Sequence, residues 1–485
     1  MQLDIDIPGL DRQFIGGSWT APSNQNSVDV ISPSTEEVLT RAANPTIADA
    51  DAAAAAAHAA FYRGPWPRMS VDERTENCAR LCDALEKRLD VLNRAWAFES
   101  GATIAHGEMI NSGAGVAVWR GALEAAPNLP WQEARDGALI LREPIGTVLG
   151  ILTFNGPIVL MGMKIIPALL AGCTVVVKHA PESALTARLI AEAIEEAGFP
   201  EGVLSVLAAD TPVTQHLVSH PDIDMVALTG GTAIGVDVVQ RTAPRLARTA
   251  LELGGKSPAI IGQDADLDEV MGTLCDGASG FQGQVCVSLS RILAPKERYD
   301  EVTDAFAERY ASFRVGDPFD PETDRGPLAV ERARDRVARY VASAIEEGAQ
   351  VVTGGKRPDH LSRGWYFEPT LLANVNNAMT VAQEEIFGPV TCVIPYESIE
   401  EAVAIANDSP YGLAASIYTN DQDLALQVAR DIRAGSVAIN QAGVSLTQPF
   451  GGYKQSGWGR ECGPEGILEF TQIKQVVTGT SYLDN

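Results

Sequence analysis

Residues 224–235 read DMVALTGGTAIG, an apolar stretch followed by two glycines and a helix-forming segment. This order predicts a buried strand that turns at Gly230 and Gly231 into the N-terminus of a helix, where free backbone N–H groups can meet phosphate oxygens. It is not the G-x-G-x-x-G dinucleotide fingerprint, because Thr232 occupies the third position. A tight turn that binds nothing is the alternative.

The same alternation of strand-like and helix-like segments extends on both sides. Between residues 146 and 262, short stretches such as TVLGIL, TVVVK, VLSVL and PAIIG are separated by helical segments such as SALTARLIAEAIEEAG. This pattern predicts βαβ units around a parallel sheet. A second α/β stretch follows Cys286, so we expect two α/β lobes. Residues 70–97 follow helical spacing, whereas 123–144 end in alternating residues that are typical of a hairpin arm.

Bulk properties limit the classes of protein to consider. A chain of 485 residues exceeds the roughly 250–300 residues at which a single core stops growing, so we expect more than one domain. Hydrophobic residues make up 46%, which is typical of a globular protein, and no apolar run is long enough to span a bilayer. The N-terminus is acidic and has no signal-peptide core, so we expect a cytoplasmic protein.

The net charge limits the possible binding partners, and the cysteine content indicates the state of the thiols. A net charge of −26 repels phosphate backbones and anionic lipids, which argues against nucleic-acid or membrane binding. The odd number of cysteines favours reduced thiols over a disulfide framework. They stand at positions 78, 82, 173, 275, 286, 392 and 462.

Two polar residues are candidates for chemistry. Glu252 lies among apolar residues and glycines after a predicted helix, where burial would raise its pKa and suit it to act as a base. Its alternative role is helix capping or ion pairing. Asn155 ends a predicted strand before Pro157, which is placed to open a helix, and its amide can donate to an oxyanion. Its alternative role is that of an N-cap.

Other candidates are weaker on their own. Lys178 ends a predicted strand at the carboxyl edge of the sheet, where a cation can meet a ribose or phosphate, unless it is a surface lysine. Glu385 lies beside Phe387 in a turn that could simply be exposed and acidic. His216 and His220 are four residues apart, but their segment lacks the glutamate of H-E-x-x-H, so we expect no metal site.

Together these stretches resemble the aldehyde dehydrogenase superfamily, in its NAD(P)-dependent, non-acylating form, over nearly the whole chain. Glu252 of LELGGKSP and Cys286 of GQVC are 34 residues apart. The segments EEIFGPV (384–390) and PFGGYKQSGWGRECG (449–463) follow in the family's order. The resemblance implies that Cys286 is the nucleophile, that Asn155 and the Cys286 N–H hold the oxyanion, and that Glu252 activates water.

The resemblance also implies an architecture. We expect two doubly wound α/β domains and a small β oligomerisation arm that joins a homodimer or homotetramer. The predicted boundaries are 1–122 and 145–254 for the dinucleotide-binding domain, 255–455 for the catalytic domain, and 123–144 with 470–485 for the arm.

The implied cofactor is NAD. NADP is not excluded, because Pro181 stands where many NAD-preferring members carry a glutamate that binds the ribose hydroxyls. The cofactor-binding residues implied by the resemblance are Phe154, Lys178, Gly230, Gly231, Thr232, Gly235, Leu253, Glu385 and Phe387.

An apolar substrate pocket is also implied, which favours a hydrophobic aldehyde of the aliphatic, terpenoid or aromatic class. A CoA-acylating dehydrogenase and a non-catalytic nucleotide-binding or structural homologue are the alternatives. The residues expected to line the pocket are Val159, Leu160, Met163, Val285, Val287 and Phe450.

Overall fold

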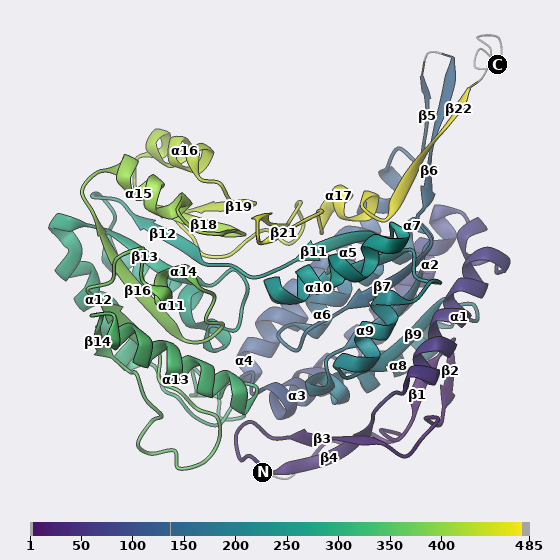
Figure 1. Ribbon diagram of the computed structural model, residues 1–485, viewed down its shortest axis with the longest axis horizontal. Helices are drawn as coiled ribbons and strands as arrows, with labels where there is room; N and C mark the ends of the chain where they lie inside the picture. The colour runs from purple at the N-terminus through teal and green to yellow at the C-terminus, as the bar shows by residue number, and fades with distance from the viewer. Residues whose placement is uncertain (1–2, 136, 478–485) are drawn as a thin grey trace.

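Two sheet-based lobes and a projecting arm make up the computed structural model, which describes residues 3–135 and 137–477. An eight-stranded sheet organises one lobe and a seven-stranded sheet organises the other (Figure 1). The predicted α/β class with two lobes is therefore confirmed. The part of the predicted arm at 478–485 lies outside the described residues, as do 1–2 and 136.

The eight-stranded sheet is parallel in its centre. From β7 the chain adds β8 and β9 on one side and then returns to add β10 and β11 on the other, so the strand order reverses between β7 and β10. In open α/β sheets, ligands bind at the carboxyl ends of the strands beside such a switch point. In sheet order the strands are β2 (Ser18–Thr20), β1 (Gln13–Ile15), β9 (Leu204–Ala208), β8 (Thr174–His179), β7 (Thr147–Ile151), β10 (Met225–Thr229), β11 (Arg248–Glu252) and β21 (Gly457–Trp458).

Helices cover both faces of this sheet, which explains the continuous apolar runs of its strands. Val176 packs with the alanines of α1 on one face, while Val175 and Val177 pack into the larger core on the other, because successive side chains of a strand alternate. The main helices of this lobe are α1 (Ile47–Arg63), α2 (Val71–Glu86), α3 (Leu89–Ser100), α5 (Val116–Ala125), α7 (Ile166–Ala171), α8 (Ala184–Ala197), α9 (Thr211–Ser219) and α10 (Thr232–Thr242).

The single helical segment expected at 70–97 is two helices. A capping box between Ser70 and Glu73 starts α2, as the sequence predicts. The helix ends at Glu86, and α3 begins at Leu89 after a short break.

The seven-stranded sheet is parallel except for β14, which pairs antiparallel with β15. Its strands, in sheet order, are β14 (Gln350–Thr353), β15 (Thr370–Ala373), β16 (Val390–Tyr396), β13 (Leu289–Pro295), β12 (Ser257–Ile261), β18 (Ala414–Tyr418) and β19 (Ser436–Ile439). The main helices around it are α11 (Leu267–Ser279), α12 (Tyr299–Ser312), α13 (Glu331–Glu346), α15 (Ile399–Asn407) and α16 (Gln422–Asp431).

The arm is an antiparallel sheet in the order β22, β6, β5, built from β5 (Gln132–Arg135), β6 (Ala138–Pro144) and β22 (Thr471–Val477). It extends away from the first lobe (Figure 1). The pairing of the distant β22 with β6 agrees with the expected arm, whereas the exact domain boundaries stay predictions. None of the helices in the described residues is both long and apolar enough to cross a bilayer.

Candidate functional site

Four candidates lie along one edge of the eight-stranded sheet. Ile151 of β7 pairs with Lys178 of β8, and Thr229 of β10 pairs with Glu252 of β11, so these carboxyl ends are level. Asn155 follows β7 by four residues, and Gly230 follows β10 directly. Glu252 is the last residue of a strand, not the residue after a helix as expected, because β11 intervenes between α10 and the glycines.

The loop that carries Cys286 has an uncommon backbone. Phe281, Gln282 and Gly283 have φ values of 47°, 55° and 64°, so three consecutive residues are left-handed. A Cβ at Gly283 would lie 2.3 Å from the carbonyl oxygen of Gly388, so only glycine fits there. Such strain persists only where the surroundings enforce it.

Two buried glutamines supply that enforcement. The Gln282 side-chain amide donates to the carbonyls of Gly326 (2.6 Å) and Phe367 (3.1 Å). The Gln284 side chain accepts from the Ala329 N–H at 3.1 Å. Residues 281–284 are buried while 285–288 are half-buried, so the loop is anchored just before Cys286 and presents the residues around the thiol. Both glutamines are visible in the sequence just before Cys286, but nothing there predicted that they anchor the loop.

Hydrogen bonds hold both the oxygen and the nitrogen of the Asn155 side-chain amide. Its Oδ1 accepts from the Thr153 hydroxyl at 2.6 Å, and its Nδ2 donates to the Gln284 carbonyl at 3.0 Å. The N-cap of the following helix α6 (Pro157–Leu160) is Gly156, and that helix has no side-chain cap. The N-cap role considered for Asn155 is therefore wrong, and its amide lies beside the Cys286 loop instead.

Glu252 is 2% exposed, and neither of its carboxylate oxygens has a hydrogen-bond partner among the described residues. Burial raises its pKa well above the usual range, and the nearby carboxylate of Glu461 raises it further. Lys164, which forms a buried ion pair with Glu461, acts in the opposite direction. Glu252 is thus neither a cap nor an ion-pair partner. The sequence reasoning missed the Lys164–Glu461 pair; the one local signal was a lysine in an apolar helix.

Cys286 is half-buried, whereas the six other cysteines are buried. Burial raises the pKa of its thiol well above the usual range, and the carboxylates of Glu252 and Glu385 raise it further. A thiolate and two carboxylates repel one another in a buried space. Having all three groups negatively charged at the same time is therefore unfavourable. A proton lost by the thiol is therefore best kept close by, on a neighbouring carboxylate.

The N-terminus of α10 is open. Its N-cap is Gly231, which offers no side chain, and a Cβ at that position would meet nothing within 4 Å. Free N–H groups in a helix's first turn attract anions. Gly230 differs from the expectation in one respect, because its own N–H already donates to the Glu252 carbonyl at 3.0 Å. Thr232 donates its hydroxyl to the Gln455 carbonyl at 3.2 Å.

Gly235 and Leu253 pack against each other. A Cβ at Gly235 would lie 2.6 Å from Leu253 Cδ1, so the glycine lets α10 approach the end of β11. Gly235 is in the first turn of α10, so this contact lies close to the open N-terminus of the helix.

Lys178 is only 9% exposed, so the surface-lysine alternative is wrong. Burial lowers its pKa to about 8, although the carboxylates of Glu182 and Asp210 oppose the shift. A buried amine near its neutral state is suited to meet a polar or anionic group at this edge.

The two glutamates of the 383–390 turn lie in different environments. Glu384 is exposed and accepts from the Tyr340 hydroxyl at 2.7 Å. Glu385 is half-buried and accepts from the Gly255 N–H at 3.1 Å, beside the Glu252 strand end. Phe387 lies edge-on to Phe154, with ring centroids 6.3 Å apart. The turn is therefore not simply an exposed acidic loop.

The segment around Cys286 packs against two apolar cores. Val159, Leu160, Met163 and Phe450 are buried in the large core against which Cys286 and Val287 pack. Val285 packs instead with Phe154 around Trp96, Ala102 and Phe281. Half-buried residues that sequence reasoning missed beside these cores are Ile110, Val444 and Leu446.

One cluster of possible metal ligands occurs among the described residues. Nε2 of His216 and His220 lie 2.5 Å and 3.4 Å from Oδ1 of Asp51. The Asp222 N–H donates to Nδ1 of His220 at 3.1 Å, so a neutral His220 carries its proton on Nε2. That tautomer donates to Asp51 and leaves no lone pair for a metal.

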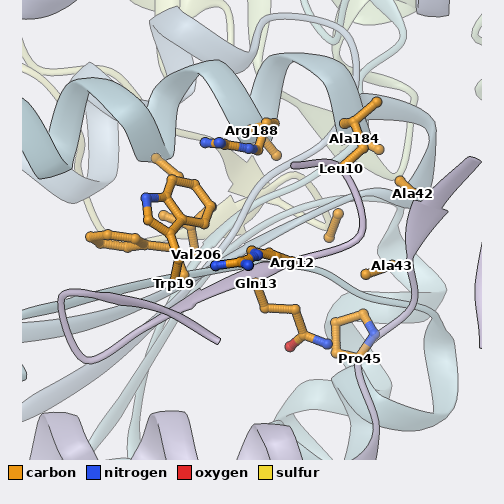
Figure 2. Close-up of a pocket in the computed structure, with 14 residues that line it drawn as sticks. Leu10, Arg12, Gln13, Trp19, Ala42, Ala43, Pro45, Ala184, Arg188 and Val206 are labelled. Carbon is orange, nitrogen blue, oxygen red and sulfur yellow. The ribbon is translucent and has the colours of Figure 1, made fainter. Parts of the chain in front are cut away.

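A small pocket lies between α8, β1 and β9 (Figure 2). Arg188 of α8 lies over the ring of Trp19, 3.6 Å from its centroid. The cavity is about 40 Å³, enough for a few waters and too small for a metabolite. No predicted site residue lines it.

Comparisons with known proteins place these observations in a family. The model of the aldehyde dehydrogenase family matches residues 19–476. Geranial dehydrogenase of Castellaniella defragrans is 41% identical, with 96% of this chain and 99% of that protein covered. A Mycobacterium tuberculosis aldehyde dehydrogenase solved with NAD⁺ has a TM-score of 0.95 at 44% identity, covering 97% and 99% of the two chains.

A second solved relative is a cysteine-to-alanine mutant of aldehyde dehydrogenase C from Pseudomonas syringae, in complex with NAD⁺ and octanal. Its TM-score is 0.93 at 38% identity, and 98% of each chain is covered. On the family match and these full-length relatives, the chain belongs to the aldehyde dehydrogenase family.

Proposed function

We propose that the protein oxidises an aldehyde to its carboxylic acid with NAD⁺, using Cys286 as the nucleophile. What supports this proposal is that Asn155 donates to Gln284, two residues before Cys286, and that the Glu252 carboxylate is near enough to raise the pKa of the Cys286 thiol. The separate relatives solved with NAD⁺ support the choice of cofactor.

The residues present fit a dinucleotide. The uncapped N-terminus of α10 at Gly231 suits the pyrophosphate, and Lys178 on the adjacent strand end suits a ribose hydroxyl. Glu385 and Phe387 would hold the nicotinamide end, because Glu385 accepts from the Gly255 N–H just after Glu252 and Phe387 lies edge-on to Phe154 just before Asn155. When bound, NAD⁺ supplies the acceptor for the hydride that leaves the substrate carbon.

The chain's own residues account for the remaining chemistry. The Cys286 sulfur forms a bond to the aldehyde carbon while its proton passes to the Glu252 carboxylate. The carbonyl oxygen becomes an oxyanion, which accepts from Asn155 Nδ2 and the Cys286 N–H. Loss of hydride leaves a thioester. Glu252 then releases its proton to solvent and takes a new proton from a water molecule, whose oxygen forms a bond to the thioester carbon. The C–S bond breaks, the acid leaves, and the thiolate takes the proton back from Glu252.

Hydrolysis is favoured over transfer to CoA by Glu252 itself. Both of its oxygens lack partners among the described residues, so they are free to accept a proton from water. A dehydrogenase that transfers its acyl group to a thiol has no need of a base for water.

A hydrophobic aldehyde of the aliphatic or terpenoid class is the proposed substrate. Cys286 and Val287 pack against the large apolar core, and Val285 packs against the smaller one around Trp96. The names of two relatives, one a geranial dehydrogenase and one bound to octanal, support this choice.

The arm is proposed to join copies of the chain into a homodimer or homotetramer. Its edge strand β22 exposes Ile473 and Val477, at 64% and 77%, on one face. Unpaired edges with apolar side chains invite pairing with another chain. Light scattering after gel filtration should show an oligomer for the native chain and a smaller species for Ile473→Lys with Val477→Lys; a native monomer contradicts the proposal.

The function is tested by NADH formation with geranial, octanal, benzaldehyde and a short charged semialdehyde, with and without CoA. Cys286→Ala is expected to abolish the activity. Cys82→Ala, at a buried thiol of α2, serves as the control and should retain it. An active Cys286→Ala variant excludes the proposed nucleophile. A higher kcat/KM for the semialdehyde excludes the proposed substrate class, and a requirement for CoA excludes hydrolysis.

A further inference from the structure

We propose that Trp96 is a positioning residue that fixes Asn155 relative to the Cys286 loop. It belongs to α3 and is fully buried. This inference rests on the proposed function. It goes further because it assigns the alignment of the oxyanion donors to a residue outside the catalytic set.

The indole N–H holds the first segment. Trp96 Nε1 donates to the carbonyl of Phe154 at 2.7 Å. Strand β7 ends at Ile151, so the chain from Thr153 to Asn155 lies beyond the sheet. The Phe154 carbonyl belongs to the peptide unit that leads into Asn155. Its hydrogen bond therefore restrains the orientation of the Asn155 backbone.

The indole ring holds the second segment. Its centroid lies 5.0 Å from that of Phe281 at an interplanar angle of 52°, a favourable aromatic geometry. Phe281 is the first of the three left-handed residues before Cys286. His106 stacks on the same Phe281 ring at 5.3 Å and 20°. The ring of Trp96 thus helps to keep the strained loop in place.

One side chain consequently contacts both segments that must supply the oxyanion donors. Asn155 Nδ2 and the Cys286 N–H come from positions far apart in the chain, joined locally by the hydrogen bond from Asn155 to Gln284. Donors of this kind work only if they stay within about 0.5 Å of the productive geometry. Trp96 supplies that restraint from the buried side.

The chain offers a matched control. Trp66 is also fully buried, and its Nε1 also donates to a main-chain carbonyl, that of Cys173 at 3.0 Å. Replacing either tryptophan with phenylalanine removes one N–H···O=C bond and keeps an aromatic ring. A purely structural role predicts the same result for Trp96→Phe and Trp66→Phe.

The test compares two reactions of the same thiol. Aldehyde oxidation develops an oxyanion, whereas alkylation of Cys286 by iodoacetamide does not. We expect Trp96→Phe to lower kcat about tenfold with little change in KM, a fraction of the 10²–10³ expected for losing an oxyanion donor outright. The alkylation rate and the affinity for NAD⁺ should stay near the native values. Trp66→Phe should leave kcat, KM and alkylation unchanged.

Trp96→Leu removes the N–H and the ring together, so both kcat and the alkylation rate should change. Equal kcat values for Trp96→Phe and Trp66→Phe would overturn the proposal. So would a parallel loss of kcat and alkylation in Trp96→Phe, since that places the effect on the thiol. If Cys286→Ala is active in the same assay, the proposed function itself fails, which keeps the two failures distinct.

Discussion

The side-chain amide of Asn155 donates to the carbonyl of Gln284 over 3.0 Å, which ties the end of β7 to the loop two residues before Cys286. The same amide is the proposed oxyanion donor. We expect Asn155→Ala to lower kcat about 10²–10³-fold, as measured for loss of such donors. Steady-state kinetics at saturating NAD⁺ provide the measurement.

Thr153→Val is the companion variant. It removes the hydroxyl that donates to Asn155 Oδ1 and leaves the amide present but less firmly oriented. Its kcat should fall between those of the native protein and Asn155→Ala. A native kcat in Asn155→Ala would exclude the donor role.

The pKa of Glu252 should depend on the buried Lys164–Glu461 pair. Burial raises this pKa most, Glu461 raises it further, and Lys164 lowers it. Glu461→Gln removes the negative neighbour and keeps the cation, so the pKa of Glu252 should fall. A base with a lower pKa stays ionised at lower pH, so the rising limb of the pH–kcat profile should move toward acid.

Glu465→Gln, an exposed change in the following helix α17 (Gly463–Leu468), is the control and should leave the profile in place. A shift toward alkaline pH in Glu461→Gln would contradict the assigned sign.

Binding of NAD⁺ should weaken as pH rises through about 8, because burial lowers the pKa of Lys178 to about 8. Below that pH the amine is charged, and above it the charge is lost. Deprotonation turns a charged hydrogen bond of about 1.5–3 kcal/mol into a neutral one of about 0.5–1.5 kcal/mol, so the dissociation constant should rise about five- to tenfold. Isothermal titration calorimetry below and above pH 8 measures this dissociation constant.

Lys178→Arg keeps its charge throughout this range and should remove the pH dependence. Equal affinity of the native chain for NAD⁺ on both sides of pH 8 would show that Lys178 makes no charged contact with the cofactor.

Local sequence signals predicted the parts of the site that local structure builds. The run at 224–235 forms β10 and α10 because an apolar strand, two glycines and a helical segment suffice for that turn. The strand predicted to end at Asn155 ends four residues earlier, at Ile151, so that boundary was wrong. Glu252 and Lys178 were candidates on local grounds, whereas the role of Cys286 as nucleophile came from the family resemblance. The chemistry of all three stays a prediction.

The missed features depend on partners far away in the chain. Glu252 ends a strand that is fixed by pairing with β10 and with β21, more than 200 residues later. Lys164 meets Glu461 across 297 positions. The break between α2 and α3 at Lys87 and Arg88 has neither glycine nor proline to announce it. Such features follow from tertiary packing, which a single sequence does not display.

Three glycine-to-alanine variants should show whether backbone strain or a steric clash explains the need for Gly283 in the Cys286 loop. Gly443 and Gly272 serve as comparison positions. Gly283 has φ +64°, and an added Cβ would lie 2.3 Å from the Gly388 carbonyl oxygen. Gly443 has φ +97° but open space around it, and Gly272, inside α11, has neither problem. Left-handed strain alone costs about 1–2 kcal/mol, whereas alanine in a helix interior gains about 0.5–1 kcal/mol over glycine.

Melting temperatures should therefore fall in the order Gly272→Ala, native, Gly443→Ala, Gly283→Ala. Gly283→Ala should also lose most of its activity, because the clash can be relieved only by moving the loop that precedes Cys286. If Gly283→Ala melts with Gly443→Ala and keeps the native kcat, the backbone contact with Gly388 does not hold the thiol in place.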